Sequence, residues 1–182
     1  MSGDALRIAG FLDPRRALSF LEELPGGSEV WAADLGASAD PDQALLAAIR
    51  LHEADPGLVR LLVDDAGARA RLCAVLGSSQ WLGDYVIADP ARARAIWEDP
   101  GEAARVMLAS VGAARVERGA FVASEDARVD DLRGAYRRVL LYLAADDLTS
   151  DDPEGFMPEV GRRIADLVDA TLEAGLALAR RD

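Results

Sequence analysis

Aspartate-proline pairs recur along this chain and constrain its fold more than any other feature of the sequence. Six of the eight prolines follow an aspartate. Asp is a strong helix N-cap because its carboxylate accepts hydrogen bonds from unpaired backbone N–H groups, and Pro is tolerated at the first helical position. Each pair therefore predicts the start of a helix. The pairs are Asp13-Pro14, Asp40-Pro41, Asp55-Pro56, Asp89-Pro90, Asp99-Pro100 and Asp152-Pro153.

These starts predict a series of short helices in residues 1–112. Ser28, Ser79 and Ser124 are further candidate caps, and Gly77 and Gly112 suit the left-handed residue that closes a helix. The predicted ranges are 14–24, 29–36, 41–54, 56–63, 66–76, 80–88, 90–98 and 101–111.

The stretch 113–124 is the least helical part of the chain. Residues 119–122 suit either a short extended piece or a buried loop, and we interpret the whole stretch as a loop. The Asp-Pro spacings follow no steady period, so the sequence does not favour a helical repeat protein.

Two long helices are predicted in residues 125–182. Apolar residues step by three and four from Val129 to Leu143, and a second stripe runs from Val160 to Leu178. The polar turn from Thr149 to Pro153 is short, so the two helices should pair antiparallel. The predicted fold is all-α, a single helical domain (1–182) in which a compact array of short helices precedes a long antiparallel helical hairpin.

The composition limits which binding partners and which cellular location we expect for this chain. The net charge of −12 makes bare nucleic acid and anionic membranes poor partners. A single cysteine, Cys73, excludes a disulfide framework within the chain and a cysteine-based zinc site. Residues 1–13 lack the pattern of a signal peptide, and the longest uncharged stretch, 72–83, is too short to span a membrane. We expect a cytoplasmic protein.

Residue types that carry catalysis are sparse. His52 is the only histidine and lies at helical spacing from Leu45 and Ile49, which is typical of a packed side chain rather than a metal ligand. Cys73 lies between apolar residues of a predicted helix, where a small buried side chain is the usual role. We predict no catalytic, cofactor-binding or metal-binding residue in this chain.

Several clusters of aspartate, glycine or arginine could in principle form metal-binding or anion-binding sites, but their positions favour structural roles. The carboxylates fall at predicted helix ends, where acidic caps are expected, and residues 146–152 lack the pattern of a calcium loop. Gly26-Gly27 suits a turn, Gly77-Ser78-Ser79 a cap between two helices, and Arg137-Arg138 a solvated helix face. The carboxylate pairs are Asp64-Asp65, Asp130-Asp131, Asp146-Asp147 and Asp151-Asp152.

Three blocks, however, carry a family resemblance. Residues 72–90 read "L..VLG.S..LGD", residues 136–149 read "YRRVLLYLAADDLT", and residues 164–174 read "IADLVDATLEA". In this order and spacing they resemble the N-terminal helical region of the bifunctional glutamine synthetase adenylyltransferase/adenylyl-removing family of actinobacteria. Asp146 stands where the family usually has Arg, and Ser150 where it often has Gly.

The resemblance implies a function for the parent protein. Such enzymes carry two nucleotidyltransferase domains: one removes AMP from a tyrosine of glutamine synthetase by phosphorolysis, and the other attaches AMP from ATP. The family's "GMGKLGG" segment and its "SD.D" carboxylates, which hold Mg²⁺ and nucleotide, are not found among residues 1–182. The resemblance thus implies a non-catalytic part that supports the downstream nucleotidyltransferase domain, with glutamine synthetase and a nitrogen-signalling regulatory protein as further partners.

A second hypothesis remains open at this stage. The chain would then be a free-standing helical interaction module without nucleotide chemistry. A reading frame that continues into "GMGKLGG" would favour the first hypothesis, and a stop codon after Asp182 the second.

Overall fold

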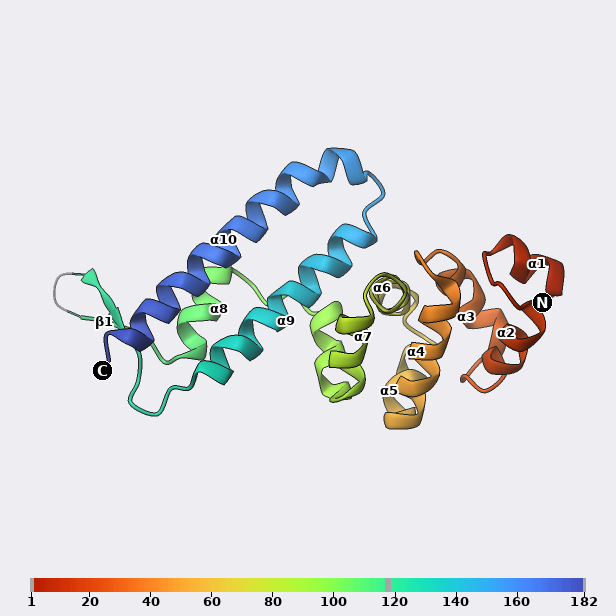
Figure 1. Cartoon of the computed structure of the whole chain (residues 1–182), viewed down its shortest axis with the longest axis horizontal. Helices are drawn as coiled ribbons and strands as arrows, with labels where there is room; N and C mark the ends of the chain where they lie inside the picture. The colour runs from red at the N-terminus through yellow and green to blue at the C-terminus, as the bar shows by residue number, and fades with distance from the viewer. Residues whose placement is uncertain (1, 117–118, 182) are drawn as a thin grey trace. The chain divides into compact units, whose positions relative to one another are not determined.

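The computed structural model describes residues 2–116 and 119–181, and it confirms the all-α class (Figure 1). Helices make up most of these residues. They are α1 (Gly3–Ile8), α2 (Pro14–Leu21), α3 (Gly27–Gly36), α4 (Pro41–Ala54), α5 (Pro56–Leu61), α6 (Ala66–Ser78), α7 (Gln80–Ile87), the 3-10 helix η1 (Pro90–Ile96), α8 (Ala103–Ser110), α9 (Val129–Leu148) and α10 (Pro153–Ala179). The strands are β1 (Ala114–Arg115) and β2 (Phe121–Val122).

The chain forms two compact units, Met1–Trp97 and Glu98–Asp182. The sequence analysis expected one domain whose internal boundaries lay at residues 112 and 124. In the structure α8 (Ala103–Ser110) belongs with the long helices, because it packs against both α9 and α10.

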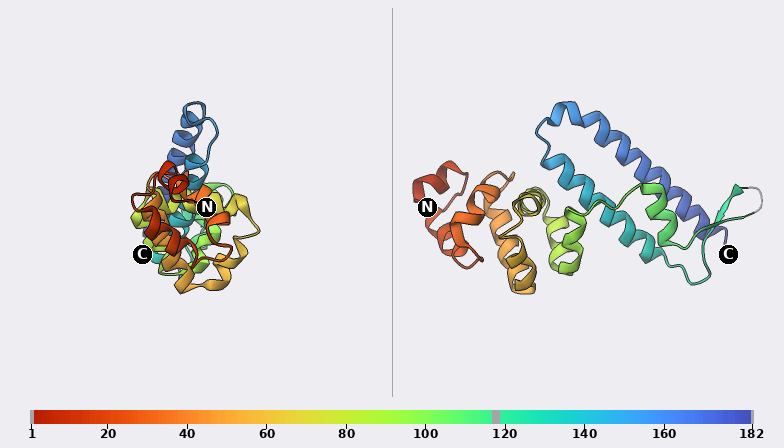
Figure 2. Two further views of the ribbon diagram at one scale, coloured as in Figure 1. Left: turned by 90° about the vertical axis from the view of Figure 1, so that its right-hand side faces the viewer. Right: turned by 180° about the vertical axis from the view of Figure 1, so that it is seen from behind.

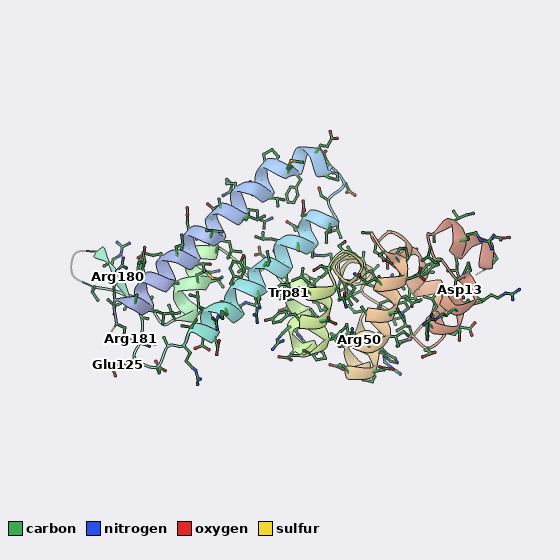
Figure 3. All side chains as sticks on the ribbon, viewed as in Figure 1. Asp13, Arg50, Trp81, Glu125, Arg180 and Arg181 are labelled. Carbon is green, nitrogen blue, oxygen red and sulfur yellow. The ribbon has the colours of Figure 1, made fainter. Side chains whose placement is uncertain are left out.

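The first unit is an array of short helices around α4 and α6. These two helices pack against each other, and both also contact α3 and α7. The Trp31 side chain is fully buried, and its Nε1 donates a hydrogen bond to the carbonyl of Pro25 at 2.7 Å. On the surface, Arg50 of α4 pairs with Asp84 of α7 at 2.8 Å (Arg50 is labelled in Figure 3).

The second unit is built on the α9–α10 hairpin, whose two helices run antiparallel as predicted (Figures 1 and 2). Helix α8 packs against both. The core of this unit includes the fully buried Met107 and Val111 from the α8 end, and the buried Leu143 and Leu167 from the two long helices. Helix packing thus accounts for most of the apolar stripe of α9, whereas Ile164, Val168 and Leu172 of the second stripe are exposed.

A short β-hairpin lies where the sequence analysis expected only a loop. Strands β1 and β2 pair antiparallel, with Ala114 opposite Val122 and Arg115 opposite Phe121. The loop interpretation of 113–124 was therefore wrong at these positions, because two-residue strands leave no periodic pattern to detect. The backbone N–H of Ala123 donates to the carbonyl of Ala177 at 3.0 Å, which joins the end of the hairpin to α10.

The end of α10 holds the segment that precedes α9. The Arg181 guanidinium donates to the carbonyls of Ser124, Glu125 and Ala127, at 3.3, 3.2 and 2.8 Å. Arg180 donates to the carbonyl of Phe121 at 3.1 Å. Figure 3 shows Arg180, Arg181 and Glu125 gathered at this end of the helix.

Four of the six Asp-Pro pairs begin helices as predicted, with the aspartate side chain accepting from backbone N–H groups. These caps are Asp13, Asp40, Asp55 and Asp152. Asp89 precedes the 3-10 helix η1 without a side-chain cap hydrogen bond. Asp99-Pro100 does not start a helix: its carboxylate accepts from Gly101 N at 2.7 Å in a tight turn, and α8 begins only at Ala103.

Of the other residues predicted to start or end helices, some are confirmed in that role and others are not. Ser79 caps α7 and Gly112 follows α8 with φ +55°, as expected. Ser28 and Ser124 are not caps, since Gly26 and Arg128 occupy those positions. Helix α1 has no Asp-Pro pair and was not predicted.

Gly77 lies inside α6 rather than at a left-handed end. A Cβ at this position would collide with the Ser38 side chain and approach the carbonyl of Asp40 to 3.0 Å. The glycine is therefore needed for close packing of α6 on the segment before α4, and its left-handed role in the sequence analysis was wrong.

Candidate functional site

A groove of about 1230 Å³ lies within the second unit. One wall is the segment from Asp99 to Arg105, which leads into α8. The other walls are the facing sides of α9 and α10, with Arg115 and Phe121 from the β-hairpin. Its floor is apolar and includes Leu108, Val139 and Leu143.

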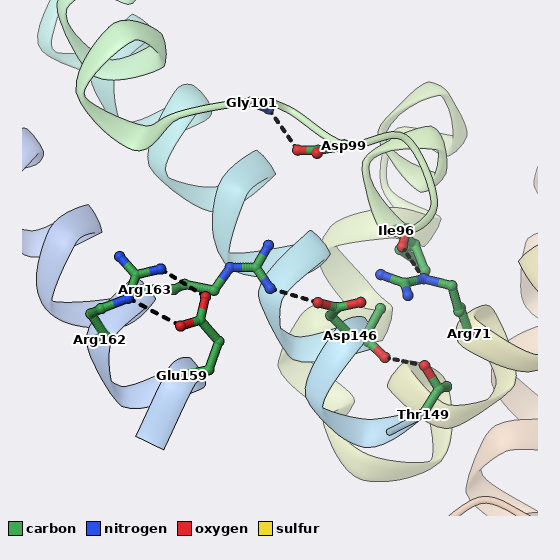
Figure 4. A network of polar contacts seen from close by, with 10 residues as sticks. Arg71, Ile96, Asp99, Gly101, Asp146, Thr149, Glu159, Arg162 and Arg163 are labelled. Atoms are coloured by element: carbon green, nitrogen blue, oxygen red, sulfur yellow. Dashed lines mark hydrogen bonds and ion pairs between the residues drawn. The ribbon is translucent and has the colours of Figure 1, made fainter. Parts of the chain in front are cut away.

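An ion pair ties the two long helices together at this groove (Figure 4). The Arg163 guanidinium of α10 lies 2.6 Å from the Asp146 carboxylate of α9, and each side chain is 26% exposed. The same guanidinium lies 5.8 Å from the centre of the Tyr142 ring. Arg163 therefore bridges the hairpin through a partly buried ion pair and a cation–π contact.

The neighbouring Arg162 is held on the surface of α10. It pairs with Glu159 at 2.7 Å and with Asp166 at 2.6 Å (the first pair is drawn in Figure 4). The hydrogen bond from Arg162 lowers the pKa of Glu159 below its usual value. The positive charge of Arg162 is thus balanced within its own helix.

The remaining rim of the groove is shaped by backbone and ring contacts. Gly101 has φ +83°, a conformation that disfavours other residues, and the Arg105 guanidinium occupies the space where a Cβ would lie. Arg115 stacks 5.2 Å from the centre of the Phe121 ring. The groove combines an apolar floor with charged walls of both signs.

Cys73 and His52 both belong to the first unit and do not line this groove. Cys73 is fully buried, and burial raises the pKa of its thiol, with the Asp34 carboxylate acting in the same direction. Such a thiol stays protonated and unreactive at neutral pH. His52 is half-buried in α4, and its Nδ1 is buried without a hydrogen-bond partner among the described residues.

The carboxylates of the four Asp pairs are distributed along the chain rather than gathered. Asp65 and Asp152 cap helices, and Asp131 accepts from the backbone N–H of Arg128. Asp130 pairs with Arg133 on the surface, at 3.0 Å. Across the residues that the structure describes, no three His, Cys, Asp or Glu side chains converge as metal ligands would. These residues therefore do not fit a Mg²⁺-nucleotide centre.

The other singled-out motifs have structural positions. Gly26, the N-cap of α3, and Gly27, its first residue, have φ +82° and +60°. In Arg137-Arg138 on α9, Arg138 is exposed, whereas Arg137 is half-buried. None of the helices in the described ranges is both long and apolar enough to cross a membrane.

Two ion pairs with structural roles were missed in the sequence. One is Arg163–Asp146, which the predicted antiparallel hairpin could have suggested because the two residues flank its turn. The other is Arg69–Asp34, at 2.6 Å, in which α6 meets α3. Its partners lie 35 residues apart, and no local pattern connects them.

Comparison with known proteins finds relatives among the bifunctional glutamine synthetase adenylyltransferase/adenylyl-removing enzymes. The chain is 37% identical over 94% of its length to the bifunctional glutamine synthetase adenylyltransferase/adenylyl-removing enzyme of Mycolicibacterium smegmatis. The enzymes of the same name from Streptomyces avermitilis and Leifsonia xyli are 35% and 33% identical, over 94% and 100% of the chain. In each case the chain spans less than a fifth of the relative, at 17% to 19%. No family model matches the chain, and no solved structure matches it significantly.

Proposed function

Because this chain is homologous to one segment of the bifunctional glutamine synthetase adenylyltransferase/adenylyl-removing enzymes, we propose that it forms the non-catalytic N-terminal helical part of such an enzyme. Its role is to support the deadenylylating nucleotidyltransferase domain in the control of nitrogen assimilation. The proposed partners are that downstream domain, glutamine synthetase and a nitrogen-signalling regulatory protein. The proposal places the chain in the cytoplasm.

The observation that carries this proposal is the match to the Mycolicibacterium smegmatis enzyme over 94% of the chain. The three blocks that carry the resemblance contribute packing residues to both units. Leu72 and Leu76 of the first block are fully buried, as is Leu141 of the second, and Leu167 of the third is 1% exposed. A match that extends over the buried cores of both units supports a shared fold for this segment.

A non-catalytic role is supported by what the polar side chains already do. Nucleotidyl transfer requires carboxylates that converge on a metal ion and donors that hold phosphates. Asp65, Asp131 and Asp152 bind backbone N–H groups at helix starts, and Asp130 and Asp146 form ion pairs with arginines. We therefore propose that the parent enzyme binds Mg²⁺ and ATP through residues outside this chain.

A chimaeric enzyme tests the supporting role. This chain replaces the matched segment of the Mycolicibacterium smegmatis enzyme, and the release of ADP from adenylylated glutamine synthetase is measured with Mg²⁺ and phosphate. We expect the chimaera to remain active. Leu143→Asp, which places a charge in the core of the second unit, should abolish the activity, whereas Leu12→Asp at a position 91% exposed should not. A folded but inactive chimaera would contradict the proposal.

The chain alone tests the absence of a catalytic site. It is incubated with adenylylated glutamine synthetase, Mg²⁺ and phosphate, and in parallel with unmodified glutamine synthetase, Mg²⁺ and ATP. We expect neither ADP release nor AMP incorporation above the level without the chain. Turnover in either reaction would show that the carboxylates of this chain form a site after all.

A further inference from the structure

The C-terminal end of α10 holds a segment of chain that has no helix or strand of its own. We call this segment, residues 123–128, the strap; it leads from β2 to α9. Nη1 of Arg181 donates to three of its backbone carbonyls, those of Ser124, Glu125 and Ala127, at 3.3, 3.2 and 2.8 Å. A single guanidinium nitrogen is therefore surrounded by three oxygens of the strap, which lies 54 to 57 residues earlier in the chain.

The preceding residue, Arg180, holds the end of the β-hairpin in the same way. Its Nη1 donates to the carbonyl of Phe121 in β2 at 3.1 Å and to the carboxylate of Glu173 at 2.9 Å. Because Glu173 lies on α10 itself, its carboxylate helps to orient the guanidinium toward the hairpin. We call Arg180 and Arg181 the clasp. Together they supply donors to four backbone carbonyls between residues 121 and 127.

The hairpin and the strap depend on contacts with the helices for their position. Strands β1 and β2 have two residues each, and such a short pair of strands is only marginally stable by itself. The backbone N–H of Ala123 donates to Ala177 of α10, and that of Ser124 to Val111 at the end of α8, both at 3.0 Å. A partly buried carbonyl that loses its donor costs free energy. The four bonds from the clasp therefore contribute to holding both segments in place.

The clasp acts on the groove because the β-hairpin forms one of its walls. Arg115 of β1 and Phe121 of β2 line the groove, and the Arg115 guanidinium lies over the Phe121 ring. Phe121 is also the residue whose carbonyl accepts from Arg180. Glu173, which binds the same guanidinium, lines the groove from α10. The hydrogen bonds of the clasp thus reach residues of the groove itself.

We propose that the clasp controls the opening of this groove. When Arg180 and Arg181 release their carbonyls, the β-hairpin and the strap move away as one local unit, while α8, α9 and α10 stay packed. The three helices share a core of their own, to which Met107, Leu143 and Leu167 belong. Local units of this kind open at a lower free energy than the whole protein. This inference concerns contacts within the second unit and does not depend on the proposed enzymatic context.

Amide hydrogen exchange of the whole chain, followed residue by residue by NMR, tests the proposal. Arg181→Met keeps a long side chain but removes the donor of three carbonyls. The amides of Ala123 and Ser124 should then exchange at least about tenfold faster, because their hydrogen bonds to α10 and to the end of α8 break when the strap opens. The amides of Leu143 and Leu167, in the middle of the long helices, should keep their rates.

Arg133→Met is the matched control. It makes the same substitution in the same unit but removes only an exposed ion pair with Asp130, so both strap amides should keep their exchange rates. A protease that cuts after glutamate gives a second readout. Cleavage after Glu125, in the strap, should be about tenfold faster in Arg181→Met than in wild type. Cleavage after Glu53, in α4 of the first unit, should keep its rate.

Two results would overturn the proposal. Unchanged exchange at Ala123 and Ser124 in Arg181→Met would show that the clasp does not hold the strap. An equal rise at these amides and at the amides in the middle of α9 and α10 would show that the second unit opens only as a whole. If circular dichroism finds Arg181→Met unfolded, the milder Arg180→Met, which frees only the carbonyl of Phe121, gives the same comparison.

Discussion

Arg69 is the buried charged residue in the part of the chain that the structure describes, at 9% exposure. Its Nε donates to the Asp34 carboxylate at 2.6 Å, and the same guanidinium donates to the carbonyls of Leu62 and Val63. It also lies 6.0 Å from the centre of the Trp31 ring. The Arg69 guanidinium thus supplies hydrogen-bond donors both to a carboxylate of α3 and to the backbone carbonyls that follow α5.

Replacing Arg69 should therefore weaken the first unit strongly. Arg69→Met keeps the length of the side chain but leaves Asp34 and two carbonyls without their donor. We expect the free energy of unfolding to fall by about 3 kcal/mol, measured by urea unfolding. Arg133→Met removes an exposed ion pair with Asp130 and should cost less than about 0.5 kcal/mol. Equal effects of the two substitutions would refute the structural role of Arg69.

Gly77 and Gly134 both lie inside helices, so the same substitution to alanine can be compared at a crowded and at an open position. Gly77→Ala brings a Cβ against Ser38 and the Asp40 carbonyl, so we expect a loss of about 1–3 kcal/mol. Gly134 lies in α9 with open space around it, and Gly134→Ala should stabilise the protein by about 0.5–1 kcal/mol. Thermal unfolding should move the two midpoints in opposite directions, and a stabilising Gly77→Ala would disprove the close packing described here.

At the scale of the element, two Asp-Pro pairs with similar sequences should differ in energy. Asp40 accepts from Gln43 N at 2.9 Å and caps α4, so Asp40→Ala should cost about 1 kcal/mol. Asp89 has no cap hydrogen bond and pairs with Arg92 on the surface at 3.2 Å. Asp89→Ala should cost less than about 0.5 kcal/mol. Urea unfolding of the two variants checks the order, which a reversal would contradict.

The surface network of α10 predicts a dependence on pH. Because Arg162 lowers the pKa of Glu159 in the folded state, Glu159 stabilises the fold above the ordinary glutamate pKa of about 4.3. That contribution is lost as the pH falls through the lowered folded value. Glu159→Gln should therefore melt below wild type at pH 7, and the difference should vanish in acid. A difference that grows as the pH falls would contradict the sign.

Helix positions could be predicted from the sequence more accurately than contacts between distant segments. The bounds of α4 agree with the predicted 41–54, because Asp40-Pro41 marks its start, and α9 begins at Val129, the first residue of the predicted apolar stripe. The β-hairpin and α1 were missed since neither carries a periodic pattern. Arg69–Asp34 and the groove depend on segments that meet only after folding, and local patterns carry no information about them.

At the scale of the whole molecule, the two units should fold separately. Each has its own buried core, and the segment from Glu98 to Glu102, at the start of the second unit, contains no helix. We expect fragments 1–97 and 98–182 to retain helical circular dichroism and cooperative melting when expressed alone, although small units are only marginally stable. A fragment that is unstructured in isolation would show that the chain folds as one domain.

Because Cys73 is buried, the chemical accessibility of its thiol reports local unfolding of the first unit. The thiol is the only one in the chain, is fully buried, and is protonated, so a thiol-specific dye can reach it only when α6 separates from its neighbours. When labelling is faster than reclosing, each opening event leads to one modified molecule. The labelling rate of the native protein then equals its rate of local opening. The wild-type protein therefore reports local unfolding through its native thiol, without an introduced cysteine.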